Sequence, residues 1–170
     1  MSEKELVLMA KEGDVKAFCT LYSGYKNRLY SYAFFKLGNA ADAEDAVQDC
    51  LLTAFEKINK LRKAEAFSSW IFRILYCNCN SKIKEQIKQR NTDDIENYKN
   101  IASFDSEKVI LQQELRQALN ILSEEERCIV LLSVVAGLKS KEIAKITGLS
   151  AGNVRQKLSR SLAKMKNELI

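Results

Sequence analysis

The sequence contains no proline, no histidine and only six glycines among its 170 residues. Because proline is the strongest helix breaker, its absence favours a chain made of helices. The absence of histidine removes the side chain that most zinc sites and most general bases use. The sequence also has no apolar run long enough to span a bilayer, and it does not open like a signal peptide. We therefore expect a cytoplasmic protein that does not insert into a membrane.

Cysteine is the remaining candidate for metal chemistry. The chain has five cysteines, three of them inside apolar helical patterns, which is typical of small buried thiols in a reducing compartment. The motif "CNC" brings Cys77 and Cys79 together, but no second pair stands at zinc spacing. The sequence also lacks a glycine-rich phosphate loop and a readable pairing of nucleophile and base. We expect no metal, no cofactor and no catalytic residues, so an enzyme is the least favoured class.

Apolar residues recur at helical spacing along most of the chain. Over residues 43–58 they stand at positions i, i+4, i+7 and i+8, which is one stripe of a helix. Similar stripes cover residues 18–33 and 67–87, so residues 1–90 are predicted to form a compact helical bundle. The stripe residues expected in its core are Phe18, Leu21, Tyr22, Tyr25, Leu29, Tyr32, Ala33, Ala43, Val47, Cys50, Leu51, Ala54, Phe55, Ile58, Phe67, Trp70, Ile71, Ile74, Leu75, Ile83 and Ile87.

A polar, acidic segment separates this bundle from the rest of the chain. Residues 91–107 carry five acidic residues and one basic residue, which predicts a flexible linker. After it the apolar pattern resumes, and "SEEE" at Ser123 to Glu126 is a capping box that starts another helix. We therefore predict an all-α fold in which two small helical domains, residues 1–90 and 108–170, are joined by the linker.

The segment "KSKEIAKITGLSAGNVRQKLSRS" has the features of a helix-turn-helix. Gly148 stands where the turn needs a left-handed backbone, and Ser150 is placed to cap the second helix. Val154 and Leu158, four residues apart, would seat that helix against the first. Because spacing, turn glycine and cap agree, we predict this motif here. The residues expected to face inward from the first helix and the turn are Ile143, Ala144, Ile146 and Leu149.

The outward positions of the second helix hold hydrogen-bond donors and positive charge but no acid. Residues 137–170 carry eight basic residues and two acidic ones. Such side chains bind base edges and phosphates in the major groove, so we predict DNA binding. The alternative is a helical hairpin whose basic face is only solvated. The predicted DNA-binding residues are Lys139, Ser140, Lys141, Ser150, Asn153, Arg155, Gln156, Lys157 and Arg160.

Two surfaces of the N-terminal bundle also suggest partners. Asp45, Gln48 and Asp49 lie within one helical turn, on the face away from the apolar stripe. An exposed acidic patch on a net basic domain favours a basic protein partner, although the helix dipole alone also favours acids near a helix start. The loop "KLRKAEAF" at residues 60–67 and the basic end of the following helix combine an aromatic side chain with cationic ones, which suits single-stranded DNA. The cations at that helix end are Lys82, Lys84, Lys88 and Arg90.

As a set, these segments resemble the extracytoplasmic-function sigma factors, the two-domain bacterial transcription initiation factors. The resemblance covers nearly the whole chain and follows the family's order through "AFCTLYSGYKNRLYSYA", "DAEDAVQDCLLTAF", "AFSSWIFRIL", "ALNILSEEERCIVLL" and "GLKSKEIAKITGLSAGNVRQKLSRSLAKMK". It implies that residues 1–90 bind core RNA polymerase and melt and read the −10 promoter element. It implies that residues 108–170 read the −35 element as duplex DNA and dock on the flap of the second-largest polymerase subunit. The linker would thread the polymerase active channel.

The resemblance also assigns roles to individual residues. Asp45, Gln48 and Asp49 match the family's contact with the clamp helices of the largest polymerase subunit, and the loop from Lys60 to Ala66 matches the segment that captures a flipped −10 base. Family members commonly respond to stress and are held inactive by an anti-sigma factor, often membrane-anchored, so we expect such a partner. The alternative is a stand-alone helix-turn-helix regulator with an N-terminal sensing bundle. The residues expected to meet the −10 element are Lys60, Arg62, Lys63, Phe67, Asn80 and Lys82.

Overall fold

The computed structural model describes residues 1–92 and 106–169, and within these ranges the regular structure is helical, without a strand. The chain divides into two compact units, Met1–Asn97 and Tyr98–Ile170, so the predicted all-α fold with two small helical units is confirmed. No helix in the described ranges is both long and apolar enough to cross a membrane. Most of the predicted linker, residues 91–107, lies outside the described residues. Its first two residues end one helix and its last two begin the next.

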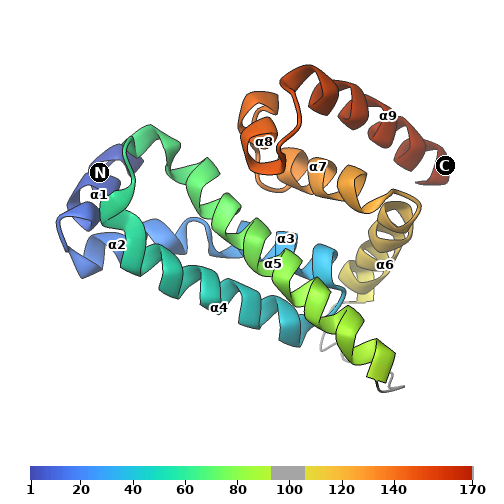
Figure 1. The fold of residues 1–170 in the computed structure, drawn as a ribbon, viewed down its shortest axis with the longest axis horizontal. Coiled ribbons are helices and arrows are strands. Elements are labelled where there is room, and N and C mark those ends of the chain that lie inside the picture. The colour runs from blue at the N-terminus through green and yellow to red at the C-terminus, as the bar shows by residue number, and fades with distance from the viewer. Residues whose placement is uncertain (93–105, 170) are drawn as a thin grey trace. The chain divides into compact units, whose positions relative to one another are not determined.

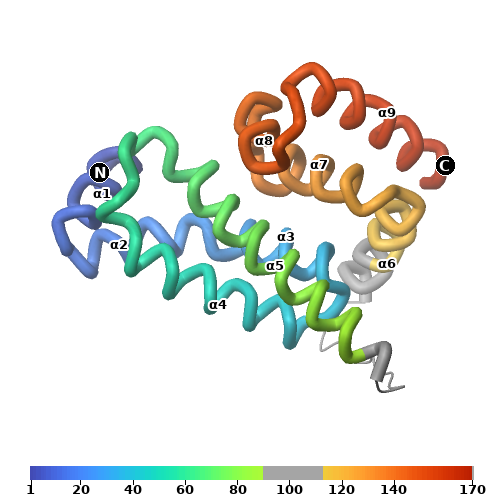
Figure 2. Tube along the Cα trace, viewed as in Figure 1, coloured from blue at the N-terminus to red at the C-terminus, as the bar shows by residue number. Residues whose placement is uncertain are grey.

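The first unit is built around three long helices, α3, α4 and α5, which pack against one another (Figure 1). Helices α4 and α5 run side by side in opposite directions. Two hydrogen bonds show this: Gln86 donates one to Asp42 near the start of α4, while the earlier Asn78 donates one to the backbone carbonyl of Ala46. Helix α1 packs against α2 and against the two short 3-10 turns, η1 and η2, that follow α4 (Figure 2). The elements are α1 (Glu3–Lys11), α2 (Val15–Ser23), α3 (Lys26–Leu37), α4 (Ala40–Lys57), η1 (Ile58–Lys60), η2 (Ala64–Ala66) and α5 (Phe67–Thr92).

Aromatic and aliphatic side chains fill the core of this unit. Tyr32, Phe67 and Phe72 are fully buried, and Tyr25 packs edge-on against Phe67 with 5.1 Å between the ring centroids. The predicted stripes therefore identified most of the core. The stripe residues that are buried are Phe18, Leu21, Tyr25, Leu29, Tyr32, Ala33, Ala43, Val47, Cys50, Ala54, Ile58, Phe67, Ile71 and Leu75.

Some of the predicted core positions are wrong. Phe55 is 49% exposed; it lies in the last turn of α4, where its ring makes an edge-to-face contact with Phe18. Ile87 is 54% exposed, because α5 runs past the start of α4 after Gln86 (Figure 1). Phe72 lies outside the predicted stripe, yet it is buried because both α3 and α4 pack against α5. The stripe residues that are only half-buried are Tyr22, Leu51, Trp70, Ile74 and Ile83.

The start of the chain also differs from the predicted pattern. The stripe over residues 18–33 belongs to two helices, since α2 ends at Ser23 and α3 begins at Lys26. Helix α1 has no counterpart among the predicted stripes. It is short and charged, it buries Val7 and Ala10, and a capping box between Ser2 and Glu5 starts it.

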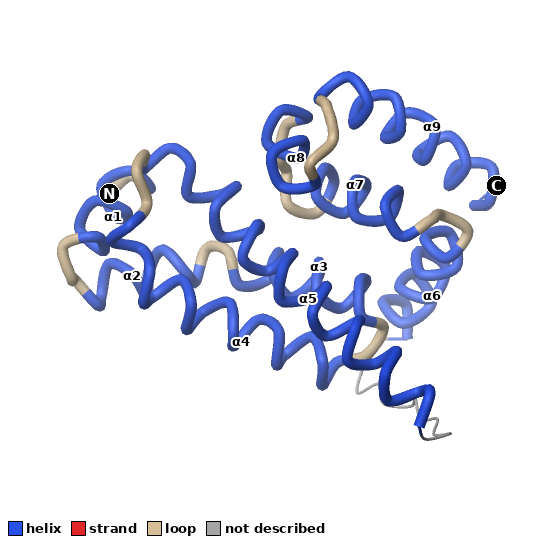
Figure 3. The backbone as a smooth tube through the Cα atoms, viewed as in Figure 1, coloured by secondary structure: helices blue, strands red, loops and turns tan. Residues whose placement is uncertain are grey.

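The second unit packs α9 against three earlier helices (Figure 3). The predicted capping box at the start of α7 is confirmed. The Ser123 hydroxyl accepts a hydrogen bond from the Glu126 N–H at 3.2 Å, and the Glu126 carboxylate accepts one from the Ser123 N–H at 3.0 Å. The helices are α6 (Ser106–Asn120), α7 (Glu124–Val134), α8 (Ser140–Thr147) and α9 (Ala151–Leu169).

The predicted helix-turn-helix is formed by α8 and α9. Gly148 ends α8 with a left-handed φ of 84°, and the Ser150 hydroxyl accepts a hydrogen bond from the Asn153 N–H at 3.1 Å. Ile143 and Val154 are fully buried, and they fix the two helices in the core of the unit. The other residues predicted to face inward are half-buried: Ala144, Ile146, Leu149 and Leu158.

Replacing Gly148 with alanine should destabilise the second unit by about 1–2 kcal/mol, because an L-residue resists the left-handed backbone. Nothing lies within 4 Å of the added Cβ, so no clash contributes. The control is Gly152→Ala in α9, whose Cβ would approach the Arg155 side chain no closer than 3.9 Å. It should raise stability by up to about 1 kcal/mol. Urea unfolding of the full chain measures both, and equal effects would contradict the explanation by strain.

Candidate nucleic-acid interface

The outer side of α9 presents the main candidate surface. Each residue of an α-helix turns the chain by about 100°, so the two positions directly after the buried Val154, and the positions one or two turns further on the same side, point away from the core. Arg155, Gln156 and Arg160 are exposed there. The first acidic residue of α9 is Glu168, in its last turn. A polar and basic side of this helix is therefore open to a polyanion.

The start of α8 adds further cations, at the end of this helix away from the turn to α9. Lys139 and Lys141 are exposed, and the Lys139 N–H donates a hydrogen bond to the Glu142 carboxylate at 2.9 Å, which helps to start the helix. Ser140 is half-buried. Ser150, predicted to contact DNA, also serves the fold, because its hydroxyl caps the start of α9.

Lys157 is held by a partner within the fold. Its ammonium group forms an ion pair with Glu125 in the first turn of α7, and its side chain is 33% exposed. Further along the same side of α9, the Ser161 hydroxyl and the Lys164 ammonium contact the Glu126 carboxylate at 3.4 and 3.0 Å. The sequence signals the capping box in "SEEE", but nothing local in it indicates that these acids also face α9.

The first unit presents an acidic side of α4. Asp45, Gln48 and Asp49 are exposed along it. The Asp45 carboxylate lies 3.9 Å from the Lys82 ammonium on α5. A residue predicted to contact the polymerase and one predicted to contact the −10 element are therefore neighbours, and the charge of Lys82 is partly offset.

The segment from the end of η1 to η2 carries exposed cations predicted for the −10 element. Leu61 and Ala64 are each 6% exposed, so their side chains anchor the segment in the core. The Glu65 carboxylate lies 3.2 Å from the Lys4 ammonium, which ties the segment to α1. The segment is thus held at both ends while its cations face solvent. These exposed cations are Lys60, Arg62 and Lys63.

Phe67 must be removed from the residues predicted to contact DNA. It is fully buried, with its ring centroid 5.1 Å from that of Tyr25 and 5.8 Å from that of Trp70, so no face of the ring is open to a base. Asn80 and Lys82 are half-buried on the same helix. At 1.5 Å per residue, Lys82 lies about 22 Å along α5 from Phe67. The remaining predicted residues therefore fall at two separate places, the segment from η1 to η2 and the middle of α5, and do not form one pocket.

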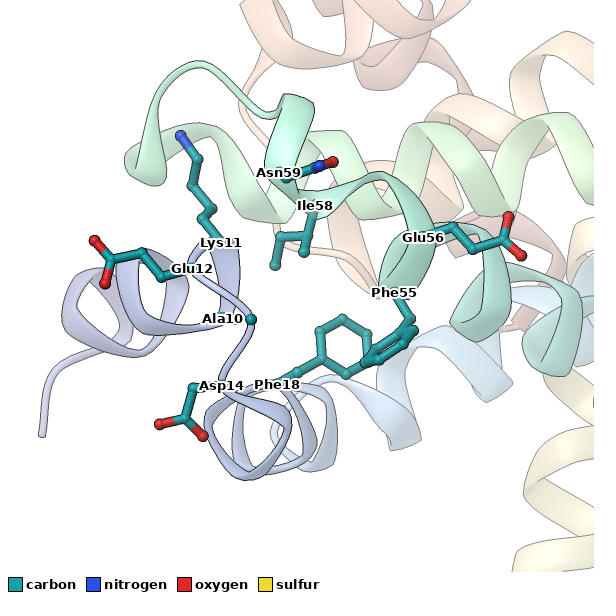
Figure 4. Close-up of a pocket in the computed structure, with 10 residues that line it drawn as sticks. Ala10, Lys11, Glu12, Asp14, Phe18, Phe55, Glu56, Ile58 and Asn59 are labelled. Atoms are coloured by element: carbon teal, nitrogen blue, oxygen red, sulfur yellow. The ribbon is translucent and has the colours of Figure 1, made fainter.

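A pocket of about 250 Å³ lies between the α1–α2 turn and the end of α4 (Figure 4). Phe18 and Phe55 meet at its base in an edge-to-face contact with 5.2 Å between centroids. The side chains of Glu12, Asp14 and Glu56 point outward from it (Figure 4). The pocket therefore lacks the converging polar groups that orient a polar cofactor.

The two cysteines of "CNC" do not form a common site. Cys77 is exposed and Cys79 is buried, so the two thiols of "CNC" leave α5 on different sides. Burial, with the Cys79 thiol nearby, raises the pKa of Cys50 to about 12, so this thiol stays protonated at neutral pH. Within the part of the chain that the structure describes, no three histidine, cysteine or acidic side chains lie close enough together to hold a metal ion.

Comparisons with known proteins place the chain among relatives of one kind. Two family models match it, one described as Sigma-70 region 2 over residues 21–89 and the other as Sigma-70, region 4 over residues 112–165. The RNA polymerase sigma factor SigV of Bacillus subtilis (strain 168) is 31% identical over 164 residues, which cover 95% of this chain and 96% of that protein. The ECF RNA polymerase sigma-E factor of Escherichia coli (strain K12) is 25% identical over 182 residues, covering 99% and 95%.

Solved structures share the fold. CnrH, solved in complex with the cytosolic domain of CnrY, matches with a TM-score of 0.75 at 22% identity and covers 98% of this chain and 96% of its own. The sigma factor RpoE from Bartonella quintana, solved in complex with the anti-sigma factor NepR, also matches with a TM-score of 0.75. Its identity is 23%, over 91% of this chain and 98% of that one. At these identities the likeness concerns the fold.

The network around Glu126 generates a prediction about pH. Its hydrogen bond with the Ser123 backbone and its ion pair with Lys164 lower the pKa of Glu126 from 4.5 to about 2. A lowered pKa stabilises the fold above pH 4.5 or so, and this contribution is lost as the pH falls toward 2. Glu126→Gln should therefore reduce the free energy of unfolding much more at pH 7 than near pH 2. Urea unfolding at several pH values measures the difference. A titration midpoint near 4.5 for the Glu126 carboxyl carbon in NMR would contradict the prediction.

Proposed function

The chain belongs to the extracytoplasmic-function RNA polymerase sigma factors, and on that basis we propose how its two helical units divide the recognition of a promoter. A sigma factor directs core RNA polymerase to the promoters at which transcription starts. The resemblance drawn from the sequence is therefore confirmed, and the stand-alone regulator is disfavoured. We propose that the chain acts in the cytoplasm, where RNA polymerase works, and that it contributes no catalytic residue of its own.

The observation that carries the proposal for the second unit is the exposed side of α9. Arg155, Gln156 and Arg160 project from a helix whose opposite side is buried. Donors on such a helix fit the base edges and walls of the major groove, so α9 would read the −35 element. Lys139 and Lys141, at the start of α8, would contact phosphates and fix the orientation of the unit on the duplex.

For the first unit we propose two separate contacts. The acidic side of α4, formed by Asp45, Gln48 and Asp49, would bind the clamp helices of the largest polymerase subunit, since an exposed acidic patch suits a basic partner. The cations from the end of η1 to η2 would hold the unpaired strand of the −10 element, because positive charge follows a single-stranded backbone. The surfaces for protein and for DNA thus lie on different elements of one bundle.

The remaining proposals concern the linker and regulation. Residues 91–107 would pass through the polymerase active channel, and the unit that follows would dock on the flap of the second-largest subunit. An anti-sigma factor, in many family members membrane-anchored, would hold the chain inactive until a stress signal releases it. The structural neighbour RpoE was solved with an anti-sigma factor bound, which supports a partner of this kind here.

The two kinds of DNA contact should respond differently to substitution. Arg155→Ala or Gln156→Ala should weaken binding to the preferred −35 sequence by about 1–3 kcal/mol and relax the preference at one base position. Lys139→Ala or Arg160→Ala should weaken binding to all sequences alike and flatten the salt slope by about one. Promoter binding by the holoenzyme is measured across single-base −35 variants and a salt series. The assignment of α9 as the reader is wrong if Arg155→Ala and Gln156→Ala both leave the base preference unchanged.

Replacing both Asp45 and Asp49 with lysine should abolish assembly with core RNA polymerase and leave the helices intact. Like charges that face each other at an interface cost several kcal/mol. The control combines Glu12→Lys and Glu168→Lys, which make the same change of charge at exposed residues outside α4. It should assemble as the wild type does. Co-purification with core polymerase compares the two, with circular dichroism to verify folding. Normal assembly of the α4 variant would rule out this contact.

A further inference from the structure

The recognition helix does not present all of its positive charge to solvent. Lys157, one of the residues predicted to meet DNA, forms an ion pair with Glu125 in the first turn of α7. We propose that Glu125 withdraws Lys157 from DNA and so lowers the affinity of α9 for the phosphate backbone. This inference rests on the proposed role of α9 as the −35 reader, because it concerns how strongly that helix holds DNA.

The three consecutive glutamates of α7 have different partners. A Glu124 carboxylate oxygen lies 3.6 Å from Arg127 in its own helix. Glu126 closes the capping box and binds Lys164. The partner of Glu125, by contrast, belongs to the residues predicted to meet DNA. The interaction of Glu125 with α9 can therefore be removed without removing the cap of α7.

Lys157 lies at the edge of the DNA-facing side of α9. Lys157, Ser161 and Lys164 follow one another at spacings of four and three residues, which places them along one flank of the helix. This flank faces the first turn of α7, as the contacts of Glu125 and Glu126 show. A lysine at this edge, once released, needs only a change of rotamer in its flexible stem to reach the wall of the groove.

The exposure of the ion pair indicates that it can be exchanged. The side chains of Lys157 and Glu125 are 33% and 45% exposed, and ion pairs of such exposure shift an equilibrium by at most about fivefold. DNA phosphates present many charges at once and gain from the release of counterions. Lys157 can therefore change partner, but the ion pair must first be given up, and the carboxylate left behind repels the phosphates. Removing that carboxylate should make DNA binding tighter and more dependent on salt.

The test compares Glu125→Gln with the wild type in holoenzyme binding to a promoter duplex, over a salt series from about 50 to 200 mM. The variant should bind about two- to fivefold more tightly at the lowest salt. The slope of log affinity against log salt should become steeper by about one, as for one further phosphate contact. The base preference across −35 variants should stay that of the wild type, because the gained contact is with the backbone.

Glu124→Gln is the matched control. It makes the same change of charge in the same helical turn, at a carboxylate that pairs with Arg127, and it should leave the slope unchanged. In the double variant Glu125→Gln, Lys157→Gln the slope should return to the wild-type value, because the released lysine is gone. Thermal melts by circular dichroism verify that all the variants fold alike.

Three results would overturn the proposal. If Glu125→Gln left the DNA affinity and its salt slope unchanged, the ion pair would serve only to pack α9 against α7. If Glu124→Gln changed the affinity and slope as much as Glu125→Gln does, the effect would come from net charge alone. If the double variant kept the steeper salt slope, Lys157 would not be the source of the additional phosphate contact. Failure of the proposed function looks different, because the wild-type holoenzyme would then show no preference for any −35 sequence, whichever residue stands at position 125.

Discussion

The rotation of α9 about its own axis determines what the second unit presents to its surroundings. Burial of Val154 and Ser161 fixes this rotation, because each residue turns the helix by about 100°. Arg155 consequently points outward, whereas Lys157 lies on the flank where the first turn of α7 supplies Glu125. One packing constraint thus decides both which side chains can reach a base edge and which cation is held by the protein itself.

The first unit depends on a comparable constraint at the segment after α4. Lys4 on α1 pairs with Glu65, and the Tyr25 hydroxyl donates a hydrogen bond to the Glu3 carboxylate at 2.7 Å. The ring of Tyr25 packs in turn against Phe67, the first residue of α5. The segment that carries the proposed −10 cations is therefore tied to the start of the chain and to the core at once. These contacts hold the backbone of the segment in place while its cations face solvent.

Features that depend on near neighbours in the chain could be predicted from the sequence, whereas contacts between helices could not. Gly148 and Ser150 were assignable because a turn and a cap involve residues within four positions of each other. The burial of Phe67 could not be predicted, because an aromatic residue beside a basic loop can stack on a base or pack in the core. Its contact with Tyr25, 42 residues earlier in the chain, places it in the core. Glu125 was missed because the capping box already explains a run of acids there, while its partner stands 32 residues away.

The distribution of the thiols has a practical consequence for chemical labelling. Cys19 and Cys77, the exposed cysteines, both belong to the first unit, while Cys50, Cys79 and Cys128 are buried. Helix α9 contains no cysteine. A maleimide dye applied to the native protein would therefore attach to α2 and α5 and leave α9 unmodified. The wild-type chain thus accepts a fluorophore on the bundle proposed to hold the opened strand, without any engineered cysteine.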